Sequence, residues 1–249
     1  MIRTKGRCTA FALFWLLALS ARAQLYVGVE AGGNKNYLIT GNASESFTNY
    51  QHMTGLSGGI PVLYQVTDWF AIQADPSYIQ KNYKIVRTGF FTGVYQETRN
   101  AYIQLPLMAQ FSFGGHELRG FVNLGMYGAY WISSRVKGVE ANILNTVDTA
   151  YTTVNPTSVL GENYGYSYNE KYQFNSTKDN RLEFGAIAGA GISYELRETY
   201  RFFIEGRYTR SLTDQQKQYE TNQTPRYNDN FGLSIGCLFS LKNLRRGAQ

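Results

Sequence analysis

The most restrictive feature of this sequence is a pair of long alternating segments, residues 101–113 and 118–132, joined by a short turn. In the first segment every second residue is apolar, from Ala101 and Ile103 to Phe113, and more polar residues stand between them. A period of two is typical of a strand with one apolar face. Two such segments around a glycine-containing turn predict a β-hairpin.

The length of these segments indicates where the hairpin lies. Each is longer than the five or six residues usual for strands in soluble sheets. About 9–11 residues are enough for a tilted strand to cross a bilayer. We therefore expect a membrane-spanning hairpin, and the rest of the chain must supply strands that close it.

Six further segments show the same alternation: residues 25–33, 54–66, 69–79, 182–196, 200–212 and 230–241. The connections between successive segments are alternately long and short. Outer-membrane barrels have short periplasmic turns, long external loops and, in single-chain bacterial examples, an even number of strands. The sequence thus predicts an all-β fold, an eight-stranded antiparallel up-and-down transmembrane β-barrel over residues 24–241.

A soluble eight-stranded barrel is the alternative, because its strands also alternate, with the apolar face inward. The lysines argue against it, since we expect all those after the amino-terminal region in loops, loop edges or the tail: Lys35, Lys81, Lys84, Lys137, Lys171, Lys178, Lys217 and Lys242. A water-facing wall would normally carry lysines. At the midplane of a lipid-facing wall a lysine costs ~2–4 kcal/mol. The absence of lysine from the expected strands therefore favours the membrane barrel.

The amino terminus has the pattern of a cleaved secretory signal over residues 1–23. Three basic residues precede the apolar run 8–19, and Ala21-Arg22-Ala23 is a small-x-small cleavage site. Removal of Arg3, Lys5, Arg7 and Arg22 reduces the 24 basic residues to 20, against 18 acidic ones. A nearly neutral mature chain gives no electrostatic reason to bind nucleic acid. We interpret residues 242–249 as a short basic periplasmic tail.

Three prolines, Pro61, Pro76 and Pro106, fall inside expected strands. Proline cannot donate a hydrogen bond to a strand ladder, and a closed barrel has no free edge to host it. Counted from the short turns, the three lie at similar heights. We therefore expect a shared line of β-bulges that bends this wall.

The hairpin also carries a sequence motif. Residues 102–108 read YIQLPLM, residues 111–113 read FSF, and residues 123–128 read NLGMYG. This pattern resembles the PorT-type outer-membrane β-barrel family, which is common in the Bacteroidetes group. The resemblance implies a barrel in the outer membrane, and a few members of that family act in protein secretion.

The residues expected to face the barrel interior include both charge signs, and we expect them to form a lumenal polar network: Glu30, Asp75, Arg119, Glu183, Glu205 and Arg207. An eight-stranded barrel is just wide enough for side chains to fill it. Buried charges must also be paired. The network is either a salt-bridged plug that closes the barrel or the lining of a narrow path for ions or small solutes.

The sequence offers no catalytic, metal or cofactor site. The two histidines, His52 and His116, are expected on opposite sides of the membrane, and Cys237 is the single cysteine after the signal. Zinc sites need several such ligands together, and a nucleophile needs an adjacent base. The expected function is therefore non-enzymatic.

The third external loop is the best candidate for a partner-binding surface. Its aromatic residues alternate with small and polar ones: Tyr164, Tyr166, Tyr168, Tyr172 and Phe174. Exposed tyrosines often mediate binding, although the same residues could instead pack over the barrel mouth. We expect a structural or interaction barrel in the outer-membrane lipid, with a protein partner on its external loops or periplasmic side and a link to secretion; the alternative is a small channel.

Overall fold

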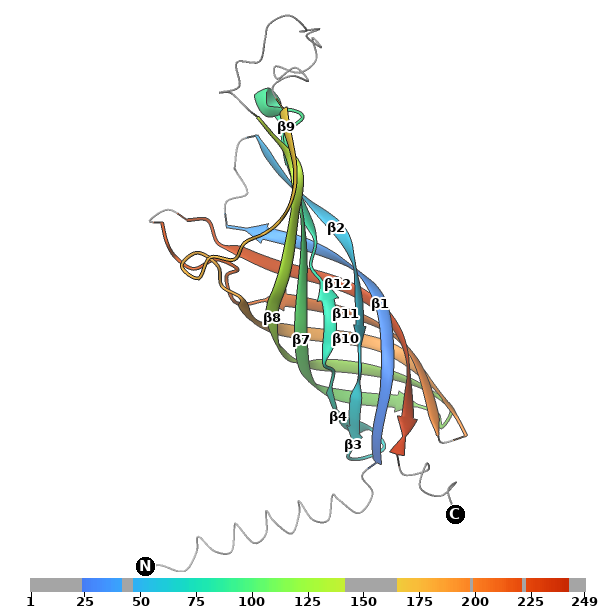
Figure 1. The fold of residues 1–249 in the computed structure, drawn as a ribbon. Coiled ribbons are helices and arrows are strands. Elements are labelled where there is room, and N and C mark those ends of the chain that lie inside the picture. The colour runs from blue at the N-terminus through green and yellow to red at the C-terminus, as the bar shows by residue number, and fades with distance from the viewer. Residues whose placement is uncertain (1–23, 42–46, 142–164, 198, 221–222, 242–249) are drawn as a thin grey trace, which may run out of the picture.

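The computed structural model describes residues 24–41, 47–141, 165–197, 199–220 and 223–241. They form one twelve-stranded antiparallel sheet (Figure 1). The strands are β1 (Gln24–Thr40), β2 (Thr48–Gly59), β3 (Val62–Gln65), β4 (Phe70–Ala74), β5 (Ser77–Gln80), β6 (Tyr83–Arg87), β7 (Tyr95–Gly114), β8 (Leu118–Ala141), β9 (Gly165–Lys171), β10 (Leu182–Leu196), β11 (Tyr200–Ser211) and β12 (Arg226–Ser240). A short 3-10 helix, Gly89–Phe91, separates β6 from β7. The expected signal peptide and basic tail lie outside the described residues.

The sheet closes into a ring. Strand β1 pairs with β12 on one side and with β2 and β3 on the other. Strand β7 pairs with β8 on one side and with β4, β5 and β6 on the other. Strands β2 and β3 share one position in the ring, and β4, β5 and β6 share another. The twelve strands, with β9 as an extension beside β8, therefore occupy eight positions around the ring. The predicted all-β antiparallel architecture is confirmed.

The ring has an apolar outside and a largely polar inside. Val29, Leu107 and Ile235 point outward and are about 60% exposed, whereas Asp75 and Asn123 are completely buried. A soluble barrel would have the opposite arrangement. No helix among the described residues is long and apolar enough to cross a membrane.

Several strands extend further outward than the sequence indicated. Strand β1 continues to Thr40 rather than residue 33, β7 begins at Tyr95 rather than Ala101, and β8 continues to Ala141. In these extensions the buried inward positions are largely polar, for example Asn36 and Asn100, and outward positions include Lys35 and Arg99, so the apolar alternation that marks a strand disappears. The alternation therefore predicted the membrane-facing part of each strand and missed the rest.

The three prolines lie side by side on neighbouring strand positions. Their carbonyls accept backbone hydrogen bonds in one direction around the wall, Pro61 from Gly28, Pro76 from Ile60 and Pro106 from Asp75, at 2.9–3.2 Å. Strand pairing is interrupted at the first two prolines, which separate β2 from β3 and β4 from β5. Strand β7 continues through the third, and the register shift between β7 and β8 falls at Ala101/Tyr102 instead. The line of prolines is present, but the predicted line of bulges is wrong for the third.

The prediction that every lysine lies in a loop, a loop edge or the tail also needs correction. Lys35, Lys84, Lys137 and Lys171 lie within strands, in parts that the sequence suggested were loops. Lys81 lies between β5 and β6 and is completely buried in the barrel interior. The prediction fails there because the charge has a partner inside the barrel.

Candidate functional site

The barrel interior begins, at the periplasmic end, with an apolar layer. Six inward side chains form it: Tyr26, Leu63, Ala71, Phe121, Phe203 and Leu238. Below them the Arg201 guanidinium donates to the Glu195 carboxylate at 2.9 Å and to the side-chain oxygen of Gln65 at 3.0 Å. Since apolar side chains pack closely, this layer closes the periplasmic side of the barrel.

Above this layer lies a cluster of one arginine and three carboxylates, here called the Arg207 cluster: Arg207, Glu30, Asp75 and Glu205. Both terminal nitrogens of Arg207 donate to Glu30, each at 3.0 Å. The same guanidinium donates to Glu205 at 2.7 Å and to Asp75. All three carboxylates are at most 9% exposed. Bidentate pairing of this kind is among the stronger ionic contacts in proteins.

Amides extend the Arg207 cluster across the barrel. Asn123 on β8 donates to the Glu205 carboxylate at 2.8 Å and is completely buried. The wall is tight here, because a Cβ atom at Gly189 would lie 2.4 Å from a Glu205 oxygen. One Asp75 oxygen, Oδ1, has no hydrogen-bond partner among the described residues. The cluster thus holds more acid than base, and it depends on a single cation.

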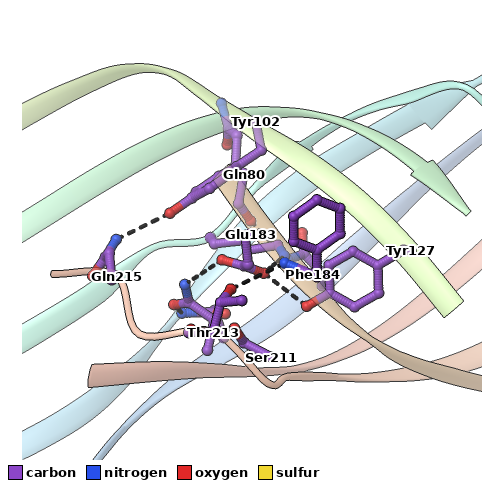
Figure 2. A network of polar contacts seen from close by, with 12 residues as sticks. Gln80, Tyr102, Tyr127, Glu183, Phe184, Ser211, Thr213 and Gln215 are labelled. Atoms are coloured by element: carbon purple, nitrogen blue, oxygen red, sulfur yellow. Dashed lines mark hydrogen bonds and ion pairs between the residues drawn. The ribbon is translucent and has the colours of Figure 1, made fainter. Parts of the chain in front are cut away.

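A second network lies nearer the external end, around the buried Lys81 and Glu183. The Lys81 ammonium is 2.5 Å from a Glu183 oxygen. The Tyr127 hydroxyl donates to the same oxygen at 2.7 Å, and Asn228 donates to the other at 2.9 Å. Figure 2 shows Tyr127 directed at the Glu183 carboxylate. We call these four residues the Lys81 network.

Aromatic rings surround the Lys81 ammonium. Its nitrogen lies 4.6 Å from the ring centre of Tyr127 and 5.0 Å from that of Tyr102. Cations are attracted to aromatic faces, most strongly when water is excluded. Gln215, from the segment after β11, donates to the Tyr102 hydroxyl at 3.0 Å (Figure 2). Tyr102, which contacts the Lys81 ammonium through its ring and Gln215 through its hydroxyl, therefore links the Lys81 network to an external segment.

The external mouth is covered by an aromatic stack, here called the aromatic cap. Trp131 lies between Tyr102 and Tyr172, parallel to each with ring centres 5.9 Å apart, and Phe174 packs edge-on against Trp131 at 4.9 Å. Tyr172 follows β9, outside the membrane-spanning strands, and its hydroxyl donates to Asp179 at 2.9 Å. Burial and this hydrogen bond raise the pKa of Tyr172 to about 12, so it remains a donor at neutral pH.

A hollow of about 470 Å³ opens at the periplasmic mouth beside Arg201, whereas the cavities further inside the barrel are small. One cavity of about 40 Å³ lies beside Glu30 and Arg207, and another of about 10 Å³ lies beside Gln73 and Phe203. A single water needs about 10–15 Å³ of free space. These cavities hold a few waters at most, and within the described residues they do not join into a channel.

The structure divides the predicted lumenal network into parts. Glu30, Asp75, Glu205 and Arg207 lie together, and Glu183 belongs to the separate Lys81 network. Arg119, expected in the interior network, instead donates to the carbonyls of Gly115 and Asp68 at the periplasmic turns.

Sequence reasoning missed three central members of these networks, Lys81, Asn123 and Asn228. Lys81 stands in a polar stretch that looks like a loop. Asn123 occurs at an inward position of an expected strand, but an uncharged amide gives no charge signal, so its inward phase was the one clue. Asn228 lies before the expected strand 230–241, in a segment that was expected to be a loop.

The tyrosine-rich loop is divided in the same way. Tyr164 lies outside the described residues. Tyr166 on β9 is 58% exposed, while Tyr168 is half-buried and donates to Gln96 at 3.3 Å. Tyr172 and Phe174 are packed in the aromatic cap. The same loop thus contributes both to the cover of the mouth and to the outer surface.

The remaining candidate ligands are dispersed. The His52 ring lies against the Tyr37 ring on the external side, tilted by 36° with ring centres 5.1 Å apart, and His116 lies in the periplasmic turn between β7 and β8. Among the described residues no group of three His, Cys, Asp or Glu side chains could hold a metal ion. The buried carboxylates of the Arg207 cluster form ion pairs with the Arg207 guanidinium.

Several solved structures are similar to this chain in fold. Neisserial surface protein A is 12% identical and matches over 88% of this chain and 99% of its own, with a TM-score of 0.41. Ail, the attachment invasion locus protein of Yersinia pestis, is 9% identical over 88% and 99%, with a TM-score of 0.39. AlkL is 12% identical over 88% and 90%, with a TM-score of 0.40. No curated protein sequence matches the chain.

A family model described as "Outer membrane protein beta-barrel domain" matches residues 18–217. This match covers most of the sequence and includes every member of the Arg207 cluster and of the Lys81 network except Asn228, which lies on β12 beyond residue 217. Together with the apolar exterior of the closed ring, it identifies an integral protein of the bacterial outer membrane, in contact with membrane lipid. The chain belongs to the outer membrane protein beta-barrel domain family.

Proposed function

We propose that this protein is a non-enzymatic, eight-stranded outer-membrane barrel whose filled interior serves as a rigid support for an external partner-binding surface. The observation that carries the proposal is the continuous filling of the interior. An apolar layer, the Arg207 cluster, the Lys81 network and the aromatic cap follow one another from the periplasmic to the external end. A barrel filled in this way supports its loops and offers no route to solutes.

The filled interior predicts the absence of steady ion conductance. Purified barrel reconstituted into planar bilayers should give no stepwise currents, because ions would have to cross two buried charge networks and an apolar layer. A water-filled porin inserted under the same conditions serves as the positive control. Steady single-channel currents from the folded barrel would support the small-channel alternative instead.

The external surface is proposed to bind its partner through the exposed part of the tyrosine-rich loop. Strand β9 pairs with β8 above the barrel and carries the exposed Tyr166 (Figure 1). Tyrosine combines a large contact area with a hydroxyl, and it is enriched at the energetic centres of interfaces. Tyr172 and Phe174 are packed in the aromatic cap. The proposed partner-binding surface is therefore smaller than the set of five alternating aromatic residues suggested.

A photo-crosslinking amino acid at position 166 is expected to capture a specific partner on intact cells, and Tyr166→Ser should reduce partner binding at least about ten-fold. The matched control is position 37, where Tyr37 on β1 is also exposed, at 42%. Partner identity can be read by mass spectrometry of the crosslinked product. Equal capture from positions 166 and 37 would contradict a partner site on β9.

The PorT-type assignment and the link to protein secretion belong to this proposal. They are supported by the YIQLPLM and NLGMYG motifs of the β7–β8 hairpin. Deletion of the gene should then reduce the amount of exported protein at the cell surface, and the wild-type chain should restore it. Unchanged surface export in the deletion strain would refute the secretion link without affecting the barrel itself.

A further inference from the structure

Three cationic side chains form a row across neighbouring strands on the outer side of the wall. Arg99 on β7 is directly paired with Arg135 on β8, and Arg135 is paired with Lys171 on β9. All three side chains are exposed. We call this row the cationic row.

Within the part of the chain that the structure describes, no acidic side chain is paired with this row. None of the three side chains forms a hydrogen bond or an ion pair with any residue that the structure describes. The next charged pair outward on the same two strands, Glu97 and Lys137, has opposite signs. Like charges directly opposite each other destabilise a sheet unless a counter-charge compensates them. Among the described residues the cationic row has no compensating charge, and an anion from outside the protein would supply one.

The cationic row lines a polar cavity of about 430 Å³. Its wall also includes Asn82, Asn100, Ser133 and Ser134, and no carboxylate is among its lining residues. Asn100 is 1% exposed, and neither its side-chain nitrogen nor its oxygen has a partner among the described residues. The Ser134 hydroxyl, 3% exposed, also lacks one. Both residues alternate with the exposed Arg99 and Arg135 and face the barrel interior, where several other buried polar atoms also lack a partner among the described residues.

The height of the cavity identifies the kind of ligand. Tyr78 lines it, and Tyr130 and Ile132 lie on the lipid-facing side of the same strands just below the cationic row. Aromatic girdles mark the boundary between hydrocarbon and headgroups. The cationic row thus stands at the level of the outer-leaflet headgroups, with an apolar wall beneath it for acyl chains.

We propose that the cavity binds the phosphate group of an outer-leaflet lipid, with Arg99, Arg135 and Lys171 as its cationic contacts. Arginine and lysine are the side chains best suited to phosphate. Ser133, also in the wall of the cavity, supplies a neutral polar group. The site shares strand β9 with the proposed partner surface, but Lys171 and Tyr166 lie near opposite ends of that strand.

The experiment is a lipid titration of the folded, full-length barrel in detergent, followed by native mass spectrometry. The probe is a monophosphoryl lipid A, and the matched probe is the same glycolipid without its phosphate. The barrel should bind the phosphorylated probe more tightly, and added salt should weaken the binding. The triple variant Arg99→Gln/Arg135→Gln/Lys171→Gln should bind it on the order of 100-fold more weakly.

Two controls keep the result interpretable. The variant Arg87→Gln/Lys178→Gln/Lys217→Gln removes the same charge from exposed external positions that do not line the cavity, and should bind like the wild type. Heat-modifiable mobility on gels checks that each variant is folded, and Arg135→Gln alone provides a milder change if the triple variant is not. Its expected loss is about five-fold.

Three outcomes would overturn the proposal. The first is equal binding of the phosphorylated lipid by the wild type and the folded triple variant. The second is equal binding of the lipid with and without phosphate. The third is inorganic phosphate binding as tightly as the lipid, since the ligand would then be a soluble anion and the apolar wall would contribute nothing.

Discussion

Arg207→Met is expected to lower the free energy of unfolding by about 3–5 kcal/mol, because it leaves three buried carboxylates without a cation. Arg207 is the one cation in contact with Glu30, Asp75 and Glu205 among the described residues. Methionine fills much of the same volume, so the loss arises mainly from charge. Urea unfolding of the barrel in lipid vesicles, followed by tryptophan fluorescence, measures the change.

The control variant also removes the three carboxylate charges that Arg207→Met leaves unpaired. Adding Glu30→Gln, Asp75→Asn and Glu205→Gln to Arg207→Met should recover most of the lost stability, because neutral amides cost far less to bury than ions. Arg207→Lys should fall between, since a lysine keeps the charge but cannot pair with Glu30 through two nitrogens. If Arg207→Met unfolds at the wild-type urea concentration, the Arg207 cluster does not hold the barrel together.

Lys81→Met is expected to cost about 3–5 kcal/mol of unfolding free energy, by the same argument applied to a single ion pair. The Glu183 carboxylate would keep its contacts to Tyr127 and Asn228, but it would remain a buried charge. The cost should appear in the same urea experiment. The change should also release the attraction between the Lys81 ammonium and the rings of Tyr102 and Tyr127.

The pair can be tested as a cycle. Lys81→Met combined with Glu183→Gln should be much less destabilised than Lys81→Met alone, because no charge is then left unpaired. Lys84→Met is a suitable control, since its ion pair with Glu97 is partly exposed and such pairs contribute about 0–1 kcal/mol. Additive effects of Lys81→Met and Glu183→Gln would show that the two side chains are not energetically coupled.

The strand pattern in the membrane could be predicted from sequence because it is a local property. A lipid-facing wall requires an apolar residue at every second position. Residues 101–113 and 230–241 show this alternation directly. Outside the bilayer the requirement ends. The extensions of β1 and β8 and the separate strand β6 therefore left no recognisable apolar alternation, whereas β9 was indicated by the alternating tyrosines of its loop.

The interior contacts could not be predicted because they depend on distant parts of the chain. Lys81 is buried only because Glu183, about a hundred residues later, meets it inside the ring. Arg119 has the inward phase expected of a network member, yet the carbonyls of Asp68 and Gly115 are nearer. Phase along a strand indicates which side a residue faces, whereas the identity of its partner depends on how the ring closes.

The length of β8 has a consequence for the cell surface. About eleven of its 24 residues follow Tyr130, which corresponds to roughly 35 Å of extended chain beyond the aromatic boundary. Surface polysaccharide attached to the lipids would surround most of this projection and hide the barrel rim from large molecules. Among the described residues, the far end of β8, where it pairs with the start of β9, would be the most accessible to an antibody, a phage or another cell.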